Sequence, residues 1–132
     1  MVSGFAFSPF YYGLQEALSL RNIWEQETNP VIITTRKART GLREIMGANV
    51  VVKRIPKSLF FGFETLKYYD LYIPVSTPEK ILIDFIYFKE PLTKETMKEL
   101  KKHINKKTLD SYLKKEKLPS ALKQKVLSKL TE

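Results

Sequence analysis

The chain has 132 residues, no cysteine, and 23 Lys and Arg against 14 Asp and Glu, which gives a formal net charge of +9. This length fits one domain with about two thirds of its unfolded surface buried, and the missing cysteines exclude a disulfide framework or a thiolate zinc site. No apolar run reaches the roughly 20 residues of a membrane helix and no signal-peptide pattern opens the chain, so we expect a cytoplasmic protein with no membrane partner.

The first predicted element is a helix. Ser8 can cap it and Pro9 suits its first position, and apolar side chains recur at helical spacing to about residue 27. Gly13 in mid-helix costs about 1 kcal/mol relative to alanine. We therefore expect another backbone to approach the helix closely at Gly13.

Four β-rich segments follow, at residues 31–35, 48–55, 60–68 and 71–75, each bounded by glycine or proline. The last two are so close in sequence that they predict a tight antiparallel hairpin at Tyr69-Asp70. No helix-length segment separates consecutive strands. The fold class we predict is α+β, with a small, mainly antiparallel sheet of about four strands.

The next predicted helix covers residues 80–88. Either Ser76 and Glu79 form a capping box before it, or Thr77 is the cap and Pro78 the first residue. Apolar side chains leave this helix no solvent face, so we expect it to be buried at the centre of the domain, packed with the N-terminal helix against the sheet.

Asp84 alone interrupts that apolar run. A buried carboxylate is costly unless paired, so Asp84 needs a cation, a backbone cap or an amide partner. We favour structural roles for Asp84 and Glu79. The alternative is a metal-dependent nuclease or nucleotide-processing enzyme in which Asp84 acts with Glu79, Glu64 or Asp70.

After residue 90 the chain becomes helical, amphipathic and rich in lysine. Thirteen lysines and six acids follow Phe88, against ten cations and eight acids up to that residue. We predict an α/β core at residues 1–90 and a helical region at residues 91–132 packed on it. The lysines favour a solvated helix surface over a nucleic-acid groove.

A second basic region has a different character, because it is rich in arginine and lies among strands. A β-branched run at residues 31–35 leads directly into a cluster of cations, with Glu44 as the one acid between residues 36 and 57. Planar guanidinium groups suit phosphate and carboxylate. We predict that this region binds an anionic partner through Arg36, Lys37, Arg39, Arg43, Lys53, Arg54 and Lys57.

Signatures of catalysis or of a bound cofactor are missing from the sequence. The five glycines never cluster into a phosphate-binding loop, and the single histidine, His103, lies among lysines where a surface position is favoured. One histidine without cysteine leaves a zinc or iron site nearly impossible. We therefore expect a protein without cofactor or metal that is not an enzyme.

The order of several motifs resembles the C-terminal domain of the AbiEi-type antitoxins, which are transcriptional regulators of abortive-infection toxin–antitoxin systems. The most specific is Pro-Glu-Lys-x-Leu-x-Asp, at residues 78–84. The segments that carry the resemblance are Val2-Ser-Gly-Phe-Ala, Tyr11-Tyr-Gly-Leu, Val31-Ile-Ile-Thr-Thr-Arg, Arg54-Ile-Pro-Lys-Ser-Leu-Phe-Phe-Gly-Phe and Val75-Ser-Thr-Pro-Glu-Lys-Ile-Leu-Ile-Asp.

The resemblance implies a non-enzymatic regulator that counters a nucleotidyltransferase-like toxin and assists repression at operator DNA. Members of this family place a DNA-binding winged helix-turn-helix before this domain. Because the chain begins where the second domain begins, we expect no winged helix in it. Tyr12 stands where the family has a histidine, which argues against chemistry there. The sequence does not indicate an oligomeric state.

Overall fold

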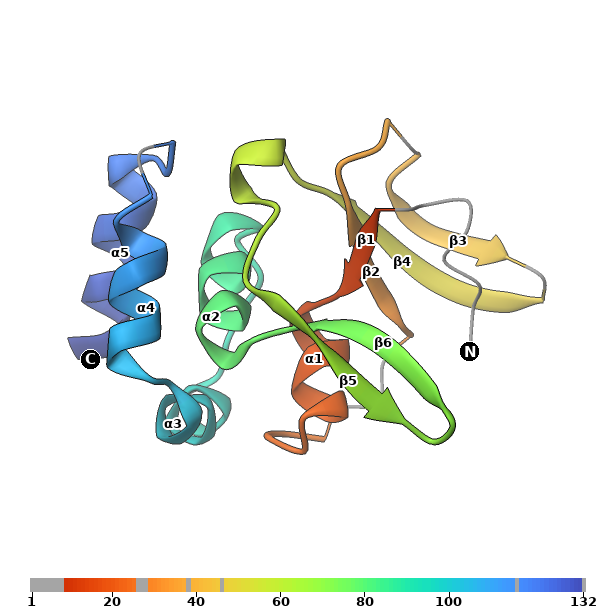
Figure 1. Cartoon of the computed structure of the whole chain (residues 1–132), viewed down its shortest axis with the longest axis horizontal. Coiled ribbons are helices and arrows are strands. Elements are labelled where there is room, and N and C mark those ends of the chain that lie inside the picture. Colours follow the sequence, from red (N-terminus) through yellow and green to blue (C-terminus); the bar gives the residue numbers. More distant parts are fainter. Residues whose placement is uncertain (1–8, 26–28, 38, 46, 116, 132) are drawn as a thin grey trace.

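The computed structural model describes residues 9–25, 29–37, 39–45, 47–115 and 117–131. Over these residues six strands form one sheet, accompanied by five α-helices and a short 3₁₀ helix (Figure 1). The strands are β1 (Phe10–Tyr12), β2 (Val31–Thr34), β3 (Gly41–Ile45), β4 (Ala48–Arg54), β5 (Phe63–Tyr68) and β6 (Leu71–Ser76). The helices are α1 (Leu14–Leu20), η2 (Lys57–Leu59), α2 (Pro78–Tyr87), α3 (Lys94–His103), α4 (Lys106–Leu113) and α5 (Ser120–Thr131).

The sheet is mixed, with the strand order β3-β4-β2-β1-β6-β5. β3 and β4 form one antiparallel hairpin and β5 and β6 another, and β1 and β2 are also antiparallel. β2 runs parallel to β4, and β1 runs parallel to β6. The α+β class is confirmed, and three of the five pairings are antiparallel as predicted. The predicted number of about four strands is too small because β1 and β3 join the sheet, and the two parallel pairings were not expected.

The predicted hairpin is confirmed, since Tyr68 pairs with Leu71 across the turn at Tyr69-Asp70. Tyr69 has a positive φ of 54° in this turn. The hairpin extends away from the helices (Figure 1), and its tip carries exposed Tyr69 and Tyr72.

The prediction of one helix from Ser8-Pro9 to about residue 27 is wrong. Ser8 lies outside the described residues, residues 10–12 form β1 in the middle of the sheet, and α1 covers only Leu14–Leu20. Pairing with β2 and β6 outweighs the helical spacing of the local sequence. Gly13 is thus the residue between strand and helix, and a Cβ there would lie 2.3 Å from Ile33 Cδ1. The atoms nearest to such a Cβ thus belong to side chains, but the backbone of β2 also lies beside Gly13, since the Gly13 N–H donates to the Val31 carbonyl at 3.2 Å.

α2 is the central helix, as predicted. Thr77 caps it by accepting a hydrogen bond from the Lys80 N–H at 3.3 Å, and Pro78 is its first residue, so the second of the two capping alternatives is confirmed. The Ser76 hydroxyl instead donates to the Tyr12 carbonyl at 3.3 Å. Residues 79–85 are all buried, whereas the last turn, from residue 86 to 88, is only partly buried.

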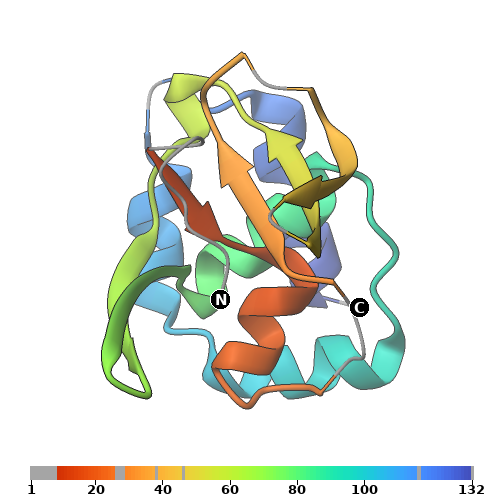
Figure 2. The ribbon, with the colours of Figure 1, turned by 90° about the vertical axis from the view of Figure 1, so that its right-hand side faces the viewer.

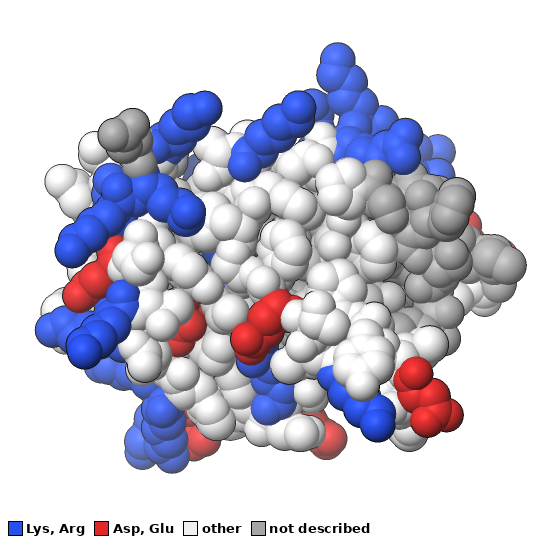
Figure 3. Space-filling view, viewed as in Figure 1, with Lys and Arg blue, Asp and Glu red and all other residues white. Residues whose placement is uncertain are grey.

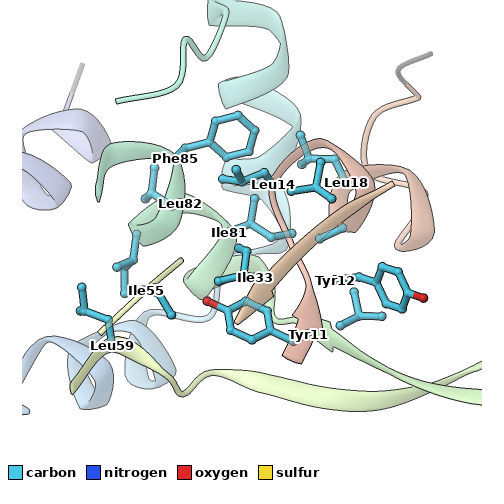
Figure 4. Packing of buried hydrophobic residues seen from close by; sticks show 14 of the residues in the cluster. Tyr11, Tyr12, Leu14, Leu18, Ile33, Ile55, Leu59, Ile81, Leu82 and Phe85 are labelled. Atoms are coloured by element: carbon cyan, nitrogen blue, oxygen red, sulfur yellow. The ribbon is translucent and has the colours of Figure 1, made fainter. Parts of the chain in front are cut away.

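The elements form layers with α2 between the sheet and the C-terminal helices (Figure 1), and Figure 2 shows the sheet in front of α2. Figure 4 shows side chains of α1, α2 and the strands meeting in one cluster, and buried residues of α3, α4 and α5 belong to the same cluster. α3, α4 and α5 all contact α2. Among the described residues, no helix has the length and apolar character needed to cross a membrane.

Candidate anion-binding edge

The arginine-rich region is organised by the parallel pairing of β2 with β4. Ile33 pairs with Lys53 and Thr34 with Arg54, so both strands end at the same edge of the sheet. The chain enters the β2–β3 connection there, at residues 35–40, and enters η2 just after Arg54. Two basic segments about 20 residues apart in sequence are thus brought together by backbone pairing, since paired strands lie about 5 Å apart.

Thr34 fixes the path of the chain as it leaves the sheet. Its side chain is fully buried, and its hydroxyl donates to the Pro9 carbonyl at 2.8 Å and accepts from the Arg36 N–H at 3.2 Å. The Thr34 carbonyl accepts from the Ile55 N–H at 2.9 Å. These bonds hold the backbone of Arg36 beside the end of β4, so the arginine is presented from a defined position.

Five exposed cations mark this edge of the sheet. Arg36, Lys37 and Arg39 lie in the β2–β3 connection, Arg54 ends β4, and Lys57 begins η2. Because β3 starts at Gly41 opposite Val52 and runs antiparallel to β4, the residues just before Gly41 approach the Arg54 end. In Figure 3, Lys and Arg atoms gather at the upper side of the molecule, over this connection and η2. The cationic edge is defined here as Arg36, Lys37, Arg39, Arg54 and Lys57.

Two of the seven predicted residues do not join this edge. Lys53 Nζ lies 3.0 Å from Glu90 Oε1 and 5.6 Å from the centre of the Phe88 ring, so its charge is already paired. Arg43 lies in β3 opposite Val50, four residues along the ladder from Arg54 and therefore about 13 Å away. The structure thus brings five of the predicted residues together.

A recess of about 260 Å³ adjoins the cationic edge, lined by Arg54, Ile55, Pro56 and Tyr87. Tyr87 comes from the last turn of α2, which the sequence predicts to be buried, yet its side chain is only partly buried. Its ring meets Phe88 edge to face, with ring centres 5.0 Å apart. Tyr87 was missed because its apolar neighbours make the helix look uniformly internal.

The carboxylate of Asp84 belongs to a fully buried network with Lys80 and Tyr11. Lys80 Nζ donates to Asp84 Oδ1 and, at 3.0 Å, to the Tyr11 hydroxyl, which donates to Asp84 Oδ2 at 2.7 Å. Lys80 therefore is the cation that Asp84 requires. The sequence contained the signal, because residues four apart share one face of a helix.

Burial sets the ionisation of this network. It lowers the pKa of Lys80 and raises the pKa values of Asp84 and Tyr11. The attraction between the Lys80 ammonium and the Asp84 carboxylate opposes the first two shifts. The aromatic rings of Tyr11 and Phe61 lie 5.3 Å and 5.1 Å from Lys80 Nζ and add a cation–π contribution. The side chains of Tyr11, Lys80 and Asp84 are all fully buried, so they make their contacts inside the protein.

The other acids considered for a nuclease lie apart and have their own roles. Glu79 is buried and its Oε2 accepts from the Asn105 N–H at 2.8 Å, before α4. Glu64 pairs with Arg21 at 2.8 Å, and Asp70 is exposed in the β5–β6 turn. Across the described part of the chain, no three His, Cys, Asp or Glu side chains converge into a metal site.

A second basic region lies on the C-terminal helices. Lys94, Lys98 and Lys101 recur along one face of α3 and, with Lys129 of α5 and Met97, line a pocket of about 370 Å³. In Figure 3 the Lys and Arg atoms over α3, α4 and α5 lie on the left, away from those of the cationic edge. His103 is exposed at the end of α3.

No protein-family model matches the chain, and no curated protein matches it. The resemblance to AbiEi-type antitoxins therefore stays a prediction from motifs. The buried network gives some of these motifs a physical reason, since Tyr11, Lys80 and Asp84 all come from them.

Proposed function

We propose that the protein is a non-enzymatic regulatory domain that binds an anionic partner through the cationic edge, as expected of an AbiEi-like antitoxin domain. One observation carries the proposal: the parallel pairing of β2 with β4 presents Arg36 and Arg54 at the same end of the sheet. Guanidinium groups on a rigid scaffold recognise phosphate and carboxylate with little ordering cost.

The arrangement of the acids supports binding rather than hydrolysis. Asp84 is neutralised by Lys80, Glu64 pairs with Arg21, and Glu79 accepts a backbone hydrogen bond. The partners proposed for this cytoplasmic regulator are nucleic-acid phosphates and the acidic surface of a nucleotidyltransferase-like toxin. Both present the oxyanions that arginine recognises.

The test compares two triple variants that lose the same charge at opposite ends of the molecule. One is Arg36→Ala with Arg39→Ala and Arg54→Ala, and the control is Lys94→Ala with Lys98→Ala and Lys101→Ala. Fluorescence anisotropy with a labelled single-stranded oligonucleotide measures the affinity of each variant. At about 0.1 M salt the edge variant should lose roughly tenfold or more in affinity, and the control substantially less.

All replaced side chains are exposed, so both variants should keep the thermal unfolding temperature of the parent protein. Equal losses in the two variants would mean that only net charge matters, and the proposal would then be wrong. If the oligonucleotide bound none of the three proteins while an acidic toxin bound the parent but not the edge variant, that result would assign the edge to the toxin.

A further inference from the structure

The recess beside the cationic edge differs from the rest of that edge because it combines an aromatic wall with a cation. Its lining residues are Arg54 from the cationic edge, Ile55 and Pro56 that follow it, and Tyr87 from the end of α2. Phosphate alone needs no aromatic wall. The ligand that uses both features has a flat ring attached to an anion.

The wall of the recess is held in place by a second layer of contacts. Phe88 meets the Tyr87 ring edge to face at 5.0 Å, and Lys53 Nζ lies 5.6 Å from the centre of the Phe88 ring. Glu90 holds Lys53 through an ion pair of 3.0 Å. Lys53 thus positions the aromatic pair instead of joining the cationic edge.

The size of the recess suits one ring system. At about 30 Å³ per liquid water, its volume of about 260 Å³ corresponds to roughly nine waters, which is comparable with the roughly ten non-hydrogen atoms of a nucleobase. Tyr87 and the Arg54 guanidinium both stack on planar rings, and Pro56 and Ile55 offer apolar contact.

We propose that the recess receives one unpaired nucleobase while the phosphates of the same strand lie on the cationic edge, so the chain prefers single-stranded nucleic acid. This inference rests on the proposed function and names its ligand. A base inside a duplex is stacked and paired and cannot enter the recess, whereas an unpaired base presents its face freely. An acidic protein surface offers no such ring.

The experiment measures binding of the whole chain to three labelled probes at equal salt: a single-stranded 12-mer, an abasic strand of the same length, and the duplex of the 12-mer. Stacking of one base on an aromatic side chain is worth about fivefold to a hundredfold in affinity. The base-bearing strand should therefore bind at least about fivefold more tightly than the abasic strand and the duplex do.

Variants at one aromatic position then assign the preference to the recess. Tyr87→Leu should bring the base-bearing strand down to the affinity of the abasic strand, and Tyr87→Phe should retain the preference because the ring remains. Tyr69→Leu is the matched control, since Tyr69 is 81% exposed at the tip of the β5–β6 hairpin and lies outside the recess. It should change none of the three affinities.

Equal affinity of the parent protein for the base-bearing and abasic strands would overturn the inference, and needs no variant to fold. The proposed role of the cationic edge would still stand if the Arg36, Arg39 and Arg54 triple variant binds both strands more weakly than the parent protein does. Loss of the preference in Tyr69→Leu but not in Tyr87→Leu would also overturn it. Failure of all three probes to bind would overturn the inference and remove nucleic acid from the proposed function.

Discussion

The buried contact of Lys80 with Asp84 is the feature that most constrains the residues around it. Two charges without solvent exposure are tolerated because they pair with each other and because the Tyr11 hydroxyl accepts a hydrogen bond from Lys80 and donates one to Asp84. Such a pair contributes little net stability compared with apolar residues of the same volume, but breaking one side of it is expensive. The sequence predicted that Asp84 needs a partner, and the spacing of four residues could have identified Lys80. Tyr11 could not be identified in this way, because it lies 73 residues from Asp84 in sequence and reaches it only in the fold.

Asp84→Asn should destabilise the protein by about 3–5 kcal/mol, because it leaves the Lys80 ammonium buried and without its counter-charge. The double variant Lys80→Met with Asp84→Asn removes the charge, keeps an acceptor for Tyr11, and should recover part of that loss. Urea unfolding of the two variants and the parent measures the difference. A double variant less stable than Asp84→Asn would contradict this account.

Glu16 gives the protein a dependence of stability on pH. Burial raises the pKa of this carboxyl in the folded state, so ionisation opposes folding. Stability contributed by the protonated form is present below the ordinary pKa of 4.5 and is lost as the pH rises through the raised value. Glu16→Gln should therefore unfold at a higher urea concentration than the parent at pH 7, and the advantage should vanish below pH 4.5. An advantage that is the same at both pH values would disprove the assignment.

At the scale of elements, Gly62 joins the entry of α2 to the buried network. Its φ is +76°, its carbonyl accepts from the Thr77 N–H at 2.8 Å, and an added Cβ would lie 2.9 Å from Lys80 Cβ. The Lys80 side chain is held by Tyr11 and Asp84 and cannot swing away. Gly62 thus serves both a backbone conformation and a packing contact.

Gly62→Ala should cost about 1–3 kcal/mol more than Gly47→Ala, because both positions have a positive φ but nothing lies within 4 Å of a Cβ at Gly47. The control therefore carries the backbone strain alone. Thermal and urea unfolding of the two variants give the comparison. Equal destabilisation would show that Lys80 yields readily to a neighbouring methyl group.

Local signals predicted some elements and failed for others, and the reason is physical. The cap at Thr77, Pro78 and the apolar run after it define α2 within a dozen residues, so the helix was predictable. β1 has three residues and depends on partners about 20 and 60 positions away, Ile33 and Val75 among them. β3 is an edge strand, and its sequence, Gly-Leu-Arg-Glu-Ile, has no alternating apolar pattern. Its best sequence signal was Gly47, which has a positive φ in the turn between β3 and β4.

The candidate site, too, could be predicted in part from the sequence. The sequence identified the cations, because a cluster of charged residues can be read directly from it. It could not separate Lys53, paired with Glu90 after α2, from Arg54 beside it, because that choice depends on a contact 37 residues away. The recess could not be predicted either, since Tyr87 and Arg54 come to line the same recess only in the folded chain.

For the whole molecule, positive charge lies on two separate regions, the cationic edge and the lysine-rich helices (Figure 3). Both attract polyanions, but they differ in how the backbone presents the cations. At the edge, parallel strand pairing and the Thr34 hydroxyl position the backbone next to Arg36 and Arg54, whereas the lysines project from helix surfaces. We propose that the edge provides specific recognition and that the helices provide general attraction.

The dependence of affinity on salt tests this assignment most directly. The logarithm of the association constant for a single-stranded oligonucleotide should fall linearly with the logarithm of salt concentration, with a slope of about 0.7 for each phosphate contact. Replacing Arg36, Arg39 and Arg54 by alanine should make the slope shallower by about two, and the Lys94, Lys98 and Lys101 triple variant should change it less. Identical slopes for the parent protein and the edge variant would mean that the cationic edge does not contact the anionic partner.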